Sequence, residues 1–489
     1  MMTLDGRVIY QLDPATFTDD GLRGVRRRLD HVRALGADTV WLGPYYVSPY
    51  RDAGYDVVDH RGVSQRFGTM ADFDDLAARC HELGMYVVVG LVMQHTSNMH
   101  PWFRSARDDP SSPYRDFYVW AQEPHEDDVV KQPVFAGVED SIWAYDGHAG
   151  KYYRHAFYRH QPDLDVGHQG VRDDIAKTVR HWIDHGADGF RVDAVPHMVR
   201  QAAVSDDRDD GFWFLTELAE YADGAPLMGE VDSEPAAYGN YFGDGDRLRG
   251  ILDFWTNSLL FLALARGDAE PLQRAMRKQP EPPDGCTYLN WLRNQDELNL
   301  ALLADDERAE VMAAFAPDEN MRVYGRGIRR RIAPMLNFDV RRIALAHAVV
   351  LSLPGVPIVR YGEELGLDED LSLPEREAVR LPMDWAAAED QKLEPGSLLS
   401  RVAQLIRIRR ELGVFGPRNA EAVAFEQPSL FAVRHQRSDD AVLMLANLAD
   451  QELHLQLDHE ADLLADQPYE PSATDITLAP YGYRWLRVK

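Results

Sequence analysis

Three carboxylates stand at or shortly after the ends of short apolar runs: Asp193, Glu230 and Asp296. Arg191 lies two residues before Asp193, so the two side chains share one face if this run is a strand. A guanidinium beside a carboxylate lowers the pKa of the acid and keeps it ionised. An ionised, oriented carboxylate is what a covalent nucleophile requires. On this stretch alone, a structural ion pair explains the two residues equally well.

The three carboxylates together predict a division of roles by pKa. Like charges that converge on one pocket must separate their pKa values. Arg191 would hold Asp193 ionised. Glu230 follows two apolar residues and is the candidate for a raised pKa. One ionised and one protonated carboxyl group flanking a bond is the machinery of glycoside hydrolysis. Unrelated solvated acids are the alternative, because the chain has 80 acidic residues.

An amphipathic helix, a glycine and a short apolar strand recur in this order along the chain. Apolar residues three and four positions apart mark the helices, glycines end them, and short apolar runs follow. Helix-then-strand units imply parallel strands, because the chain must cross back before each new strand begins. The units are 22–35 with 39–42, 73–83 with 85–89, and 171–183 with 189–193.

Eight apolar runs in total are candidate strands of one parallel sheet. Eight parallel strands with intervening helices over this length favour an α/β fold of the (β/α)8 TIM-barrel type. An open doubly wound sheet is the alternative, but it would usually bring a glycine-rich phosphate loop after an early strand, and the sequence shows none. In a barrel, Asp193, Glu230 and Asp296 would converge at the C-terminal ends of the strands. The candidate strands are 8–10, 39–42, 85–89, 189–193, 227–229, 251–254, 288–291 and 356–359.

Two segments depart from the barrel pattern. Residues 98–165 follow the third strand, are rich in aromatic and charged residues, and predict an inserted subdomain over the strand ends. After a helix near 398–412, several short apolar runs predict a small antiparallel β domain. The predicted domains are a catalytic barrel of residues 1–97 and 166–412, an inserted subdomain B of residues 98–165, and a C-terminal β-sandwich of residues 413–489.

The composition narrows the classes of partner. The net charge is 52 − 80 = −28, which disfavours nucleic acid and anionic membrane surfaces and makes a neutral substrate easier to accept. No apolar run approaches the ~18 residues of a membrane span. Two cysteines, Cys80 and Cys286, form no disulfide framework, and the first residues lack the pattern of a secretion signal. A soluble cytoplasmic protein is therefore predicted, and a homo-oligomer is left open.

Five sequence blocks, in order, resemble those of the α-amylase superfamily, glycoside hydrolase family 13, and the resemblance covers almost the whole chain. Within the superfamily the chain is most similar to trehalose synthases, and related α-glucosidases share several of the same stretches. The five blocks are 91–97, 161–165, 188–193, 228–230 and 292–297. The stretches typical of trehalose synthases are 238–246, 321–334, 353–363 and 379–385.

The resemblance implies a role for each carboxylate. Asp193 would attack the anomeric carbon and give a β-glucosyl-enzyme. Glu230 would protonate the leaving oxygen and then deprotonate water or an acceptor hydroxyl. Asp296 would bind sugar hydroxyls and favour the oxocarbenium-like transition state. Asp56 and Arg380 match a pair that closes the end of the pocket, which favours chemistry on single glucose units. The substrate-binding residues implied by the resemblance are Asp56, His95, Arg191, Gln295 and Arg380.

The sequence departs from the family pattern around these carboxylates. Gln295 stands where His usually precedes the third carboxylate, and Gln forms hydrogen bonds but carries no charge at neutral pH. Gly90 and Gln94 replace the usual Asp and Asn, and Arg360 stands where Tyr is common. That Asn often helps to hold a structural calcium ion, so calcium is the weaker expectation here. The resemblance implies no cofactor and no metal for the chemistry itself.

Three functions fit these observations. The broadest is a retaining, exo-type α-glucosidase or transglucosylase that acts on a small α-glucoside or disaccharide through a β-glucosyl-Asp intermediate. The alternative is a trehalose synthase, which interconverts maltose and trehalose by intramolecular transfer. The two differ in what removes the glucosyl group, and a closed pocket that retains the freed glucose would favour transfer over water. A non-catalytic sugar-binding protein on the same fold is the third reading, and the three intact carboxylates argue against it.

Overall fold

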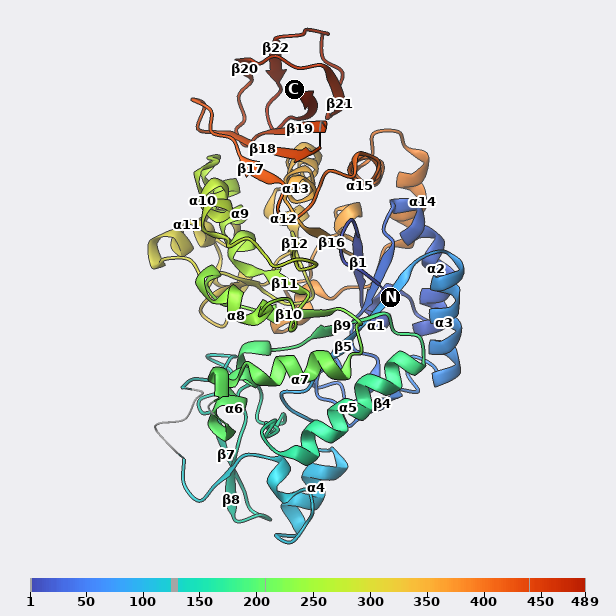
Figure 1. Cartoon of the computed structure of the whole chain (residues 1–489), viewed down its shortest axis with the longest axis vertical. Coiled ribbons are helices and arrows are strands. Elements are labelled where there is room, and N and C mark those ends of the chain that lie inside the picture. The colour runs from blue at the N-terminus through green and yellow to red at the C-terminus, as the bar shows by residue number, and fades with distance from the viewer. Residues whose placement is uncertain (1, 125–130, 207, 439, 489) are drawn as a thin grey trace.

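Eight parallel strands close into a barrel (Figure 1). The computed structural model describes residues 2–124, 131–206, 208–438 and 440–488. Successive barrel strands pair in chain order, and β16 pairs with β1 to close the barrel. The predicted TIM barrel is confirmed, and each barrel strand overlaps a run that the sequence marks as a strand. The barrel strands are β1 (Ile9–Leu12), β2 (Thr39–Leu42), β5 (Tyr86–Leu91), β9 (Gly189–Val192), β10 (Leu227–Val231), β11 (Gly250–Asp253), β12 (Thr287–Trp291) and β16 (Val356–Arg360).

Helices connect the barrel strands, and local signals fix several of their ends. The Thr69 hydroxyl caps α3 by accepting from the backbone N–H of Asp72, whose carboxylate accepts from the backbone N–H of Thr69 in return. α2 ends at Gly36, whose φ of 102° favours glycine. The helices outside the inserted segment are α1 (Pro14–Phe17), α2 (Gly21–Leu35), α3 (Met70–Glu82), α5 (Gln169–Asp184), α6 (Val195–Ser205), α7 (Trp213–Tyr221), α8 (Tyr238–Phe242), α9 (Phe254–Arg266), α10 (Glu270–Lys278), α11 (Asp305–Phe315), α12 (Ile332–Met335), α13 (Val340–Ser352), α14 (Trp385–Leu393) and α15 (Leu398–Leu412).

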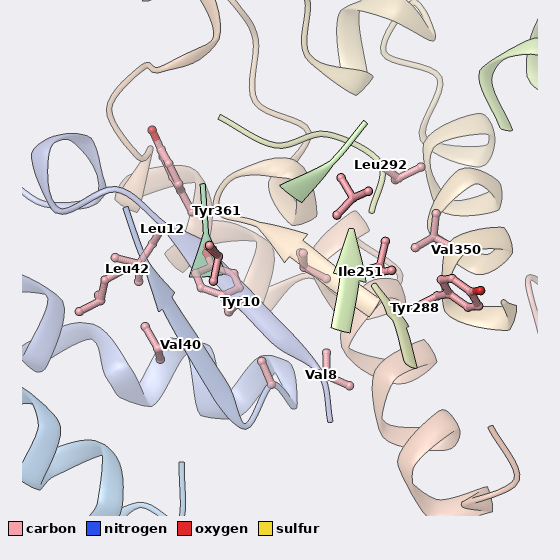
Figure 2. Close-up of a cluster of buried hydrophobic side chains, with 14 of the residues drawn as sticks. Val8, Tyr10, Leu12, Val40, Leu42, Ile251, Tyr288, Leu292, Val350 and Tyr361 are labelled. Atoms are coloured by element: carbon pink, nitrogen blue, oxygen red, sulfur yellow. The ribbon is translucent and has the colours of Figure 1, made fainter. Parts of the chain in front are cut away.

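Alternation along the strands separates the core into two layers. Tyr10 and Leu12 of β1 pack with Val40 and Leu42 of β2 in a large cluster that also takes in the helices (Figure 2). Neighbouring positions on the same strands belong to a second cluster, which must fill the barrel interior because successive side chains point to opposite faces. The barrel strands contribute Ile9, Trp41, Tyr86, Val88, Met228, Leu252, Leu289, Trp291, Val356 and Ile358 to this inner cluster.

The same alternation turns the polar residues of β9 inward. Phe190 and Val192 are fully buried in the outer cluster. Arg191, between them, faces the barrel interior, where its guanidinium carbon lies 5.5 Å from the ring centre of Trp41. Asp193 directly follows the strand. The interior therefore carries a cation and a carboxylate at the end of the barrel where the strands finish.

The chain between β5 and α5 forms a segment inserted after the third barrel strand, as expected. It contains α4 (Pro101–Asp108) and a three-stranded antiparallel sheet in the order β6-β8-β7. A β-bridge between His95 and Asp163 joins its end to the residues that follow β5. The strands of the inserted sheet are β6 (Trp120–Ala121), β7 (Trp143–Asp146) and β8 (Lys151–Arg154). Smaller sheets pair β3 (Tyr46–Val47) with β4 (Asp59–Val63), and β15 (Gly327–Ile328) with β13 (Leu298–Asn299) and β14 (Arg322–Val323).

The C-terminal strands form two antiparallel sheets that pack against each other. Leu443 of the larger sheet and Leu455 of the smaller one share an apolar cluster. Val442 and Trp485, on the opposite face of the larger sheet, belong to the cluster that covers the barrel. Figure 1 shows these strands and the inserted segment at opposite ends of the molecule. The larger sheet has the order β17 (Ala420–Ala422), β18 (Leu430–Arg437), β19 (Asp440–Asn447), β23 (Tyr483–Val488), β21 (Ala461–Ala465), and the smaller pairs β20 (Leu453–Gln456) with β22 (Asp475–Leu478).

The exact domain limits at residues 97, 165 and 412 stay predictions. Within the described parts of the chain, no helix has the length and apolar character needed to cross a membrane.

Candidate active site

A cavity of about 80 Å³ lies at the C-terminal ends of the barrel strands. Asp193 follows β9, Glu230 belongs to β10 and Asp296 lies beyond the end of β12. All three side chains line the cavity, together with Phe135 and Phe157 of the inserted segment. The structure therefore brings the three predicted carboxylates, from three different strands, into one partly aromatic cavity.

Arg191 holds two of these carboxylates. Its side chain is 2 % exposed, forms an ion pair with Asp193, and places one nitrogen 2.8 Å from Oε1 of Glu230. The backbone N–H of Ala194 donates to Oε2 of Glu230 at 3.0 Å, and Ala194 adopts a left-handed φ of 50° at this point. Such a conformation is strained for a residue other than glycine and is typical of functional sites. Arg191 was expected to line the sugar site, and in the structure it positions the acids that line it.

The surroundings of Glu230 favour its protonated form. Burial raises the pKa of Glu230 to about 8, Asp193 adds to the rise, and Arg191 opposes it. At neutral pH the group therefore keeps its proton, next to a carboxylate that is ion-paired with Arg191. Such a pair can protonate a leaving oxygen on one side of a glycosidic bond while the carboxylate attacks the anomeric carbon.

Asp296 is held in the opposite protonation state. Burial alone would raise its pKa, but Arg376 and Arg380 outweigh this effect and keep the pKa of Asp296 below its ordinary value. Arg376 Nη1 and Arg380 Nη2 lie 2.7 and 3.0 Å from Oδ1 of Asp296. Gln295 Nε2 donates to Oδ2 at 2.8 Å. The result is an ionised and fixed acceptor for hydroxyl groups.

Asp56 takes a different place from the one predicted at the end of the pocket. Its side chain is fully buried and accepts from the Ser48 hydroxyl at 2.8 Å and from the backbone N–H groups of Arg51 and Asp52 at 3.3 Å. These bonds shape the turn between β3 and β4. Arg380, its expected partner, instead donates to Asp296, so the structure corrects the predicted pairing.

The ion pair at the cavity is made by Asp52 and Arg376. Both side chains line the cavity, and Arg376 also reaches Asp296 as described above. Gln161 Nε2 fixes the second oxygen of Asp52 from 2.9 Å. Sequence reasoning missed this pair because Asp52 lies four residues before Asp56, and Arg376 four before Arg380. In each segment two residues of the same type stand four positions apart, and their spacing alone did not show which of the two lies at the cavity.

Gln295 connects Asp296 to Tyr55 and to β1, which lies two strands from β12 in the barrel. Its Nε2 donates to Asp296 and, at 3.0 Å, to the Tyr55 hydroxyl. Its Oε1 accepts from Nε2 of Gln11 on β1. The Arg380 Nε donates to the backbone carbonyl of Gln295 at 2.9 Å. An uncharged amide thus makes three side-chain contacts at a position where the family pattern has an imidazole.

His95 lines the cavity, as expected. Its Nε2 lies 3.2 Å from the Tyr55 carbonyl, and its ring packs 5.1 Å from that of Phe157. Nδ1 of His95 is buried and has no hydrogen-bond partner within the described residues. His197 also lines the cavity, and burial lowers its pKa to about 3, which keeps the ring neutral. No periodicity or spacing in the sequence marks His197 as a site residue.

Three segments meet beside the cavity and are joined there by hydrogen bonds. Tyr158 of the inserted segment and Tyr324 of the β14–β15 turn both donate to the Glu375 carboxylate, Tyr324 at 2.6 Å. Phe135 packs between the two tyrosines, with ring centres 4.3 and 4.8 Å away. Arg326 donates to the backbone carbonyl of residue 134 at 2.7 Å. These five residues, Phe135, Tyr158, Tyr324, Arg326 and Glu375, are named the roof junction.

Within residues 2–124, 131–206, 208–438 and 440–488, no group of three or more His, Cys, Asp or Glu side chains could hold a metal ion.

A closed α/β barrel with buried carboxylates at its strand ends is typical of glycoside-active enzymes. The chain belongs to the α-amylase family, since the alpha amylase catalytic domain matches residues 13–263. It is therefore an enzyme that acts on α-glucosides.

Several relatives match the chain over nearly its whole length. A trehalose synthase of Pimelobacter sp. (strain R48) is 32% identical, covering 97% of this chain and 93% of that protein. An oligo-1,6-glucosidase of Heyndrickxia coagulans is 26% identical over 97% of each chain. Among solved structures, a mutant of MutB in complex with glucose aligns with a TM-score of 0.80 and 22% identity over 100% of both chains. An alpha-amylase from H. orenii aligns with a TM-score of 0.79 and 22% identity over 99% of both. At this identity the two structures support the fold alone.

Proposed function

We propose that this protein is a trehalose synthase, which converts maltose into trehalose, and the reverse, by moving one glucosyl group within the bound disaccharide. Four relatives that are 32–34% identical over 90–99% of this chain are named trehalose synthase, in two cases, or trehalose synthase/amylase, in the other two. They favour this function over the broader α-glucosidase that the sequence alone suggested. Solved structures of similar fold hold sucrose or glucose, which supports a small-sugar substrate.

The three carboxylates divide the work of both half-reactions. Glu230 gives its proton to the glycosidic oxygen as the Asp193 carboxylate forms a bond to the anomeric carbon, and the second glucose is freed. That glucose turns within the pocket and presents its anomeric hydroxyl. Glu230 takes the proton of this hydroxyl, its oxygen bonds to the anomeric carbon, and Asp193 leaves as a carboxylate. Asp296 binds hydroxyls of the glucosyl ring throughout.

The roof junction is the observation that carries this proposal over hydrolysis. Isomerisation requires that the freed glucose stays and that water stays out, because both compete for the same glucosyl-enzyme. The roof junction joins the inserted segment to the segments after β12 and β16 through one shared carboxylate. Two phenylalanine rings stand in the wall of the cavity beside it. A freed glucose held in such a space is the nearest nucleophile.

Product analysis tests the proposal. The protein is incubated separately with maltose, trehalose, sucrose and an aryl α-glucoside, and the sugars formed are separated and quantified. Trehalose as the main product from maltose, and maltose from trehalose, is the expected result. Free glucose as the sole product from every substrate would contradict the proposal and support an exo-α-glucosidase. Sugar binding without turnover would support the non-catalytic reading.

A further inference from the structure

A buried ion pair next to the barrel links two parts of the inserted segment, β8 and the stretch around Asp163. Arg154, the last residue of β8, is 3 % exposed at its side chain, and Asp163 is 0 % exposed. Arg154 Nε lies 2.8 Å from Oδ2 of Asp163, and the backbone N–H of Ala156 lies 3.1 and 3.2 Å from the two oxygens. Both carboxylate oxygens therefore already have donors from the chain.

The same guanidinium also contacts a helix of the barrel. A second nitrogen of Arg154 donates to the side chain of Gln201 on α6. The Gln201 amide in turn donates to Oδ1 of Asp165 at 3.0 Å. The Arg154 guanidinium therefore links β8 with the end of the inserted segment at Asp163 and Asp165, and with α6, the helix that follows β9. Since Asp163 also bridges to His95, this connection lies one residue from the cavity wall.

The residues at this place do not fit a divalent ion. A calcium ion takes about six to eight oxygen ligands, several of them carboxylate oxygens. Asp163 is engaged by Arg154 and Ala156, and Gln94 stands where the family pattern has the calcium-holding Asn. The Gln94 side chain is fully buried, and its amide finds no partner among the described residues. A positive guanidinium within contact distance of Asp163 would also repel a second cation.

We propose that Arg154 supplies, from within the chain, the positive charge that a bound cation would otherwise provide where the inserted segment meets the barrel. A buried carboxylate without a counter-charge is strongly destabilising. Arg154 removes that cost for Asp163, so the wall that carries His95 keeps its shape with no calcium ion. The inference concerns stability and stands whether or not the protein makes trehalose.

The first test uses the unmodified protein. Thermal unfolding is followed after dialysis against a chelator and again with about 5 mM CaCl2. The proposal expects the two Tm values to agree within about 1 °C, because no specific site gains occupancy. A calcium-dependent rise of several degrees, together with calcium retained by the purified protein, would overturn it.

The second test removes the charge. Arg154→Ser is expected to lower Tm by about 5 to 10 °C, since it strands a buried carboxylate. Asp163→Asn in the same chain is expected to recover part of that loss, because the stranded charge disappears. Arg180→Met is the matched control, because Arg180 forms an exposed ion pair with Asp223 at 3.3 Å, and its Tm should stay within about 1 °C.

A third measurement separates charge from packing. Calcium or guanidinium ions at low millimolar concentration should raise the Tm of Arg154→Ser relative to the unmodified protein under the same conditions. Recovery by neither ion would show that Arg154 acts by filling space, and would overturn the proposal. If Arg154→Ser does not fold, the comparison of chelator and calcium on the unmodified protein still decides.

Discussion

The raised pKa of Glu230 makes the stability of the fold depend on pH. Burial raises its pKa from 4.5 to about 8, so the folded state binds this proton more tightly than the unfolded chain does. The stability that this group contributes is complete below pH 4.5 and is lost as the pH rises through 8. Above that pH the folded protein must hold an ionised carboxylate in a partly buried site, and the general acid is gone.

Glu230→Gln should therefore stabilise the protein in alkaline solution. Glutamine keeps one of the two oxygens, for Arg191 or for the backbone N–H of Ala194, and it cannot ionise. We expect the variant to exceed the unmodified protein by about 1 to 3 kcal/mol at pH 9, and to match it near pH 4.5. Denaturant unfolding at the two pH values measures this, with Glu220→Gln on exposed α7 as control. An equal effect at both pH values would argue against a raised pKa.

Gln295 helps to fix the orientation of the Asp296 carboxylate. Its amide serves Asp296, Tyr55 and Gln11 at once, and an imidazole cannot reproduce all three contacts. For Gln295→His we expect kcat/KM for maltose to fall about 10- to 100-fold, because hydrogen bonds to a charged group are lost. Tm should move by no more than about 2 °C. Steady-state kinetics on maltose and an aryl α-glucoside check this, and an unchanged substrate profile would count against a specificity role for Gln295.

For single residues, the three carboxylates at the strand ends were easier to predict from the sequence than the residues that pair with them. Asp193, Glu230 and Asp296 follow strands, and the strand ends of a barrel must converge, so their meeting was predictable. The partner of Arg376 was not, since Asp52 lies 324 residues away and the turn that presents it is shaped by buried Asp56. Contacts of that separation leave no trace in local spacing.

At the scale of elements, the proposed function assigns the choice between transfer and hydrolysis to the roof junction. Tyr324→Phe and Glu375→Ala each remove hydrogen bonds between segments without touching the three carboxylates. We expect each variant to raise the share of glucose among the products from maltose by about threefold or more, because water enters more often. Quantified glucose and trehalose give this ratio. Tyr145→Phe, at an exposed position on β7, is the control and should leave the ratio unchanged. If both roof variants give the same ratio of glucose to trehalose as the unmodified protein, the roof junction does not control which product forms.

The elements themselves were largely predictable. Helices such as α2 and α3 carry an apolar face and a glycine or capping signal at their ends, and the strands are continuous apolar runs. The short strands of the turns, such as β13 to β15, were not found. They have two residues each and exist because the barrel places their neighbours alongside.

At the scale of the whole molecule, the C-terminal sheets complete the hydrophobic core. Val442 and Trp485 are buried against the barrel, and His435 Nε2 lies 2.7 Å from the Ser352 carbonyl at the end of α13. A chain that ends at residue 412 would expose this apolar face of α13 and α15. We expect such a chain to be much less soluble than the full chain when both are expressed in the same way. Recovery of a soluble, monomeric and active truncated barrel would show that the sheets are dispensable.

In the proposed reaction, the glucosyl group moves within one bound disaccharide and never meets a sugar from solution. The most direct measurement mixes maltose that is uniformly labelled with carbon-13 in both glucose units with unlabelled maltose, and determines the masses of the trehalose formed. Intramolecular transfer under a closed roof junction predicts trehalose with both units labelled or neither. Trehalose with one labelled and one unlabelled unit, formed in proportion to the mixture, would show that the freed glucose leaves the pocket and would contradict the account.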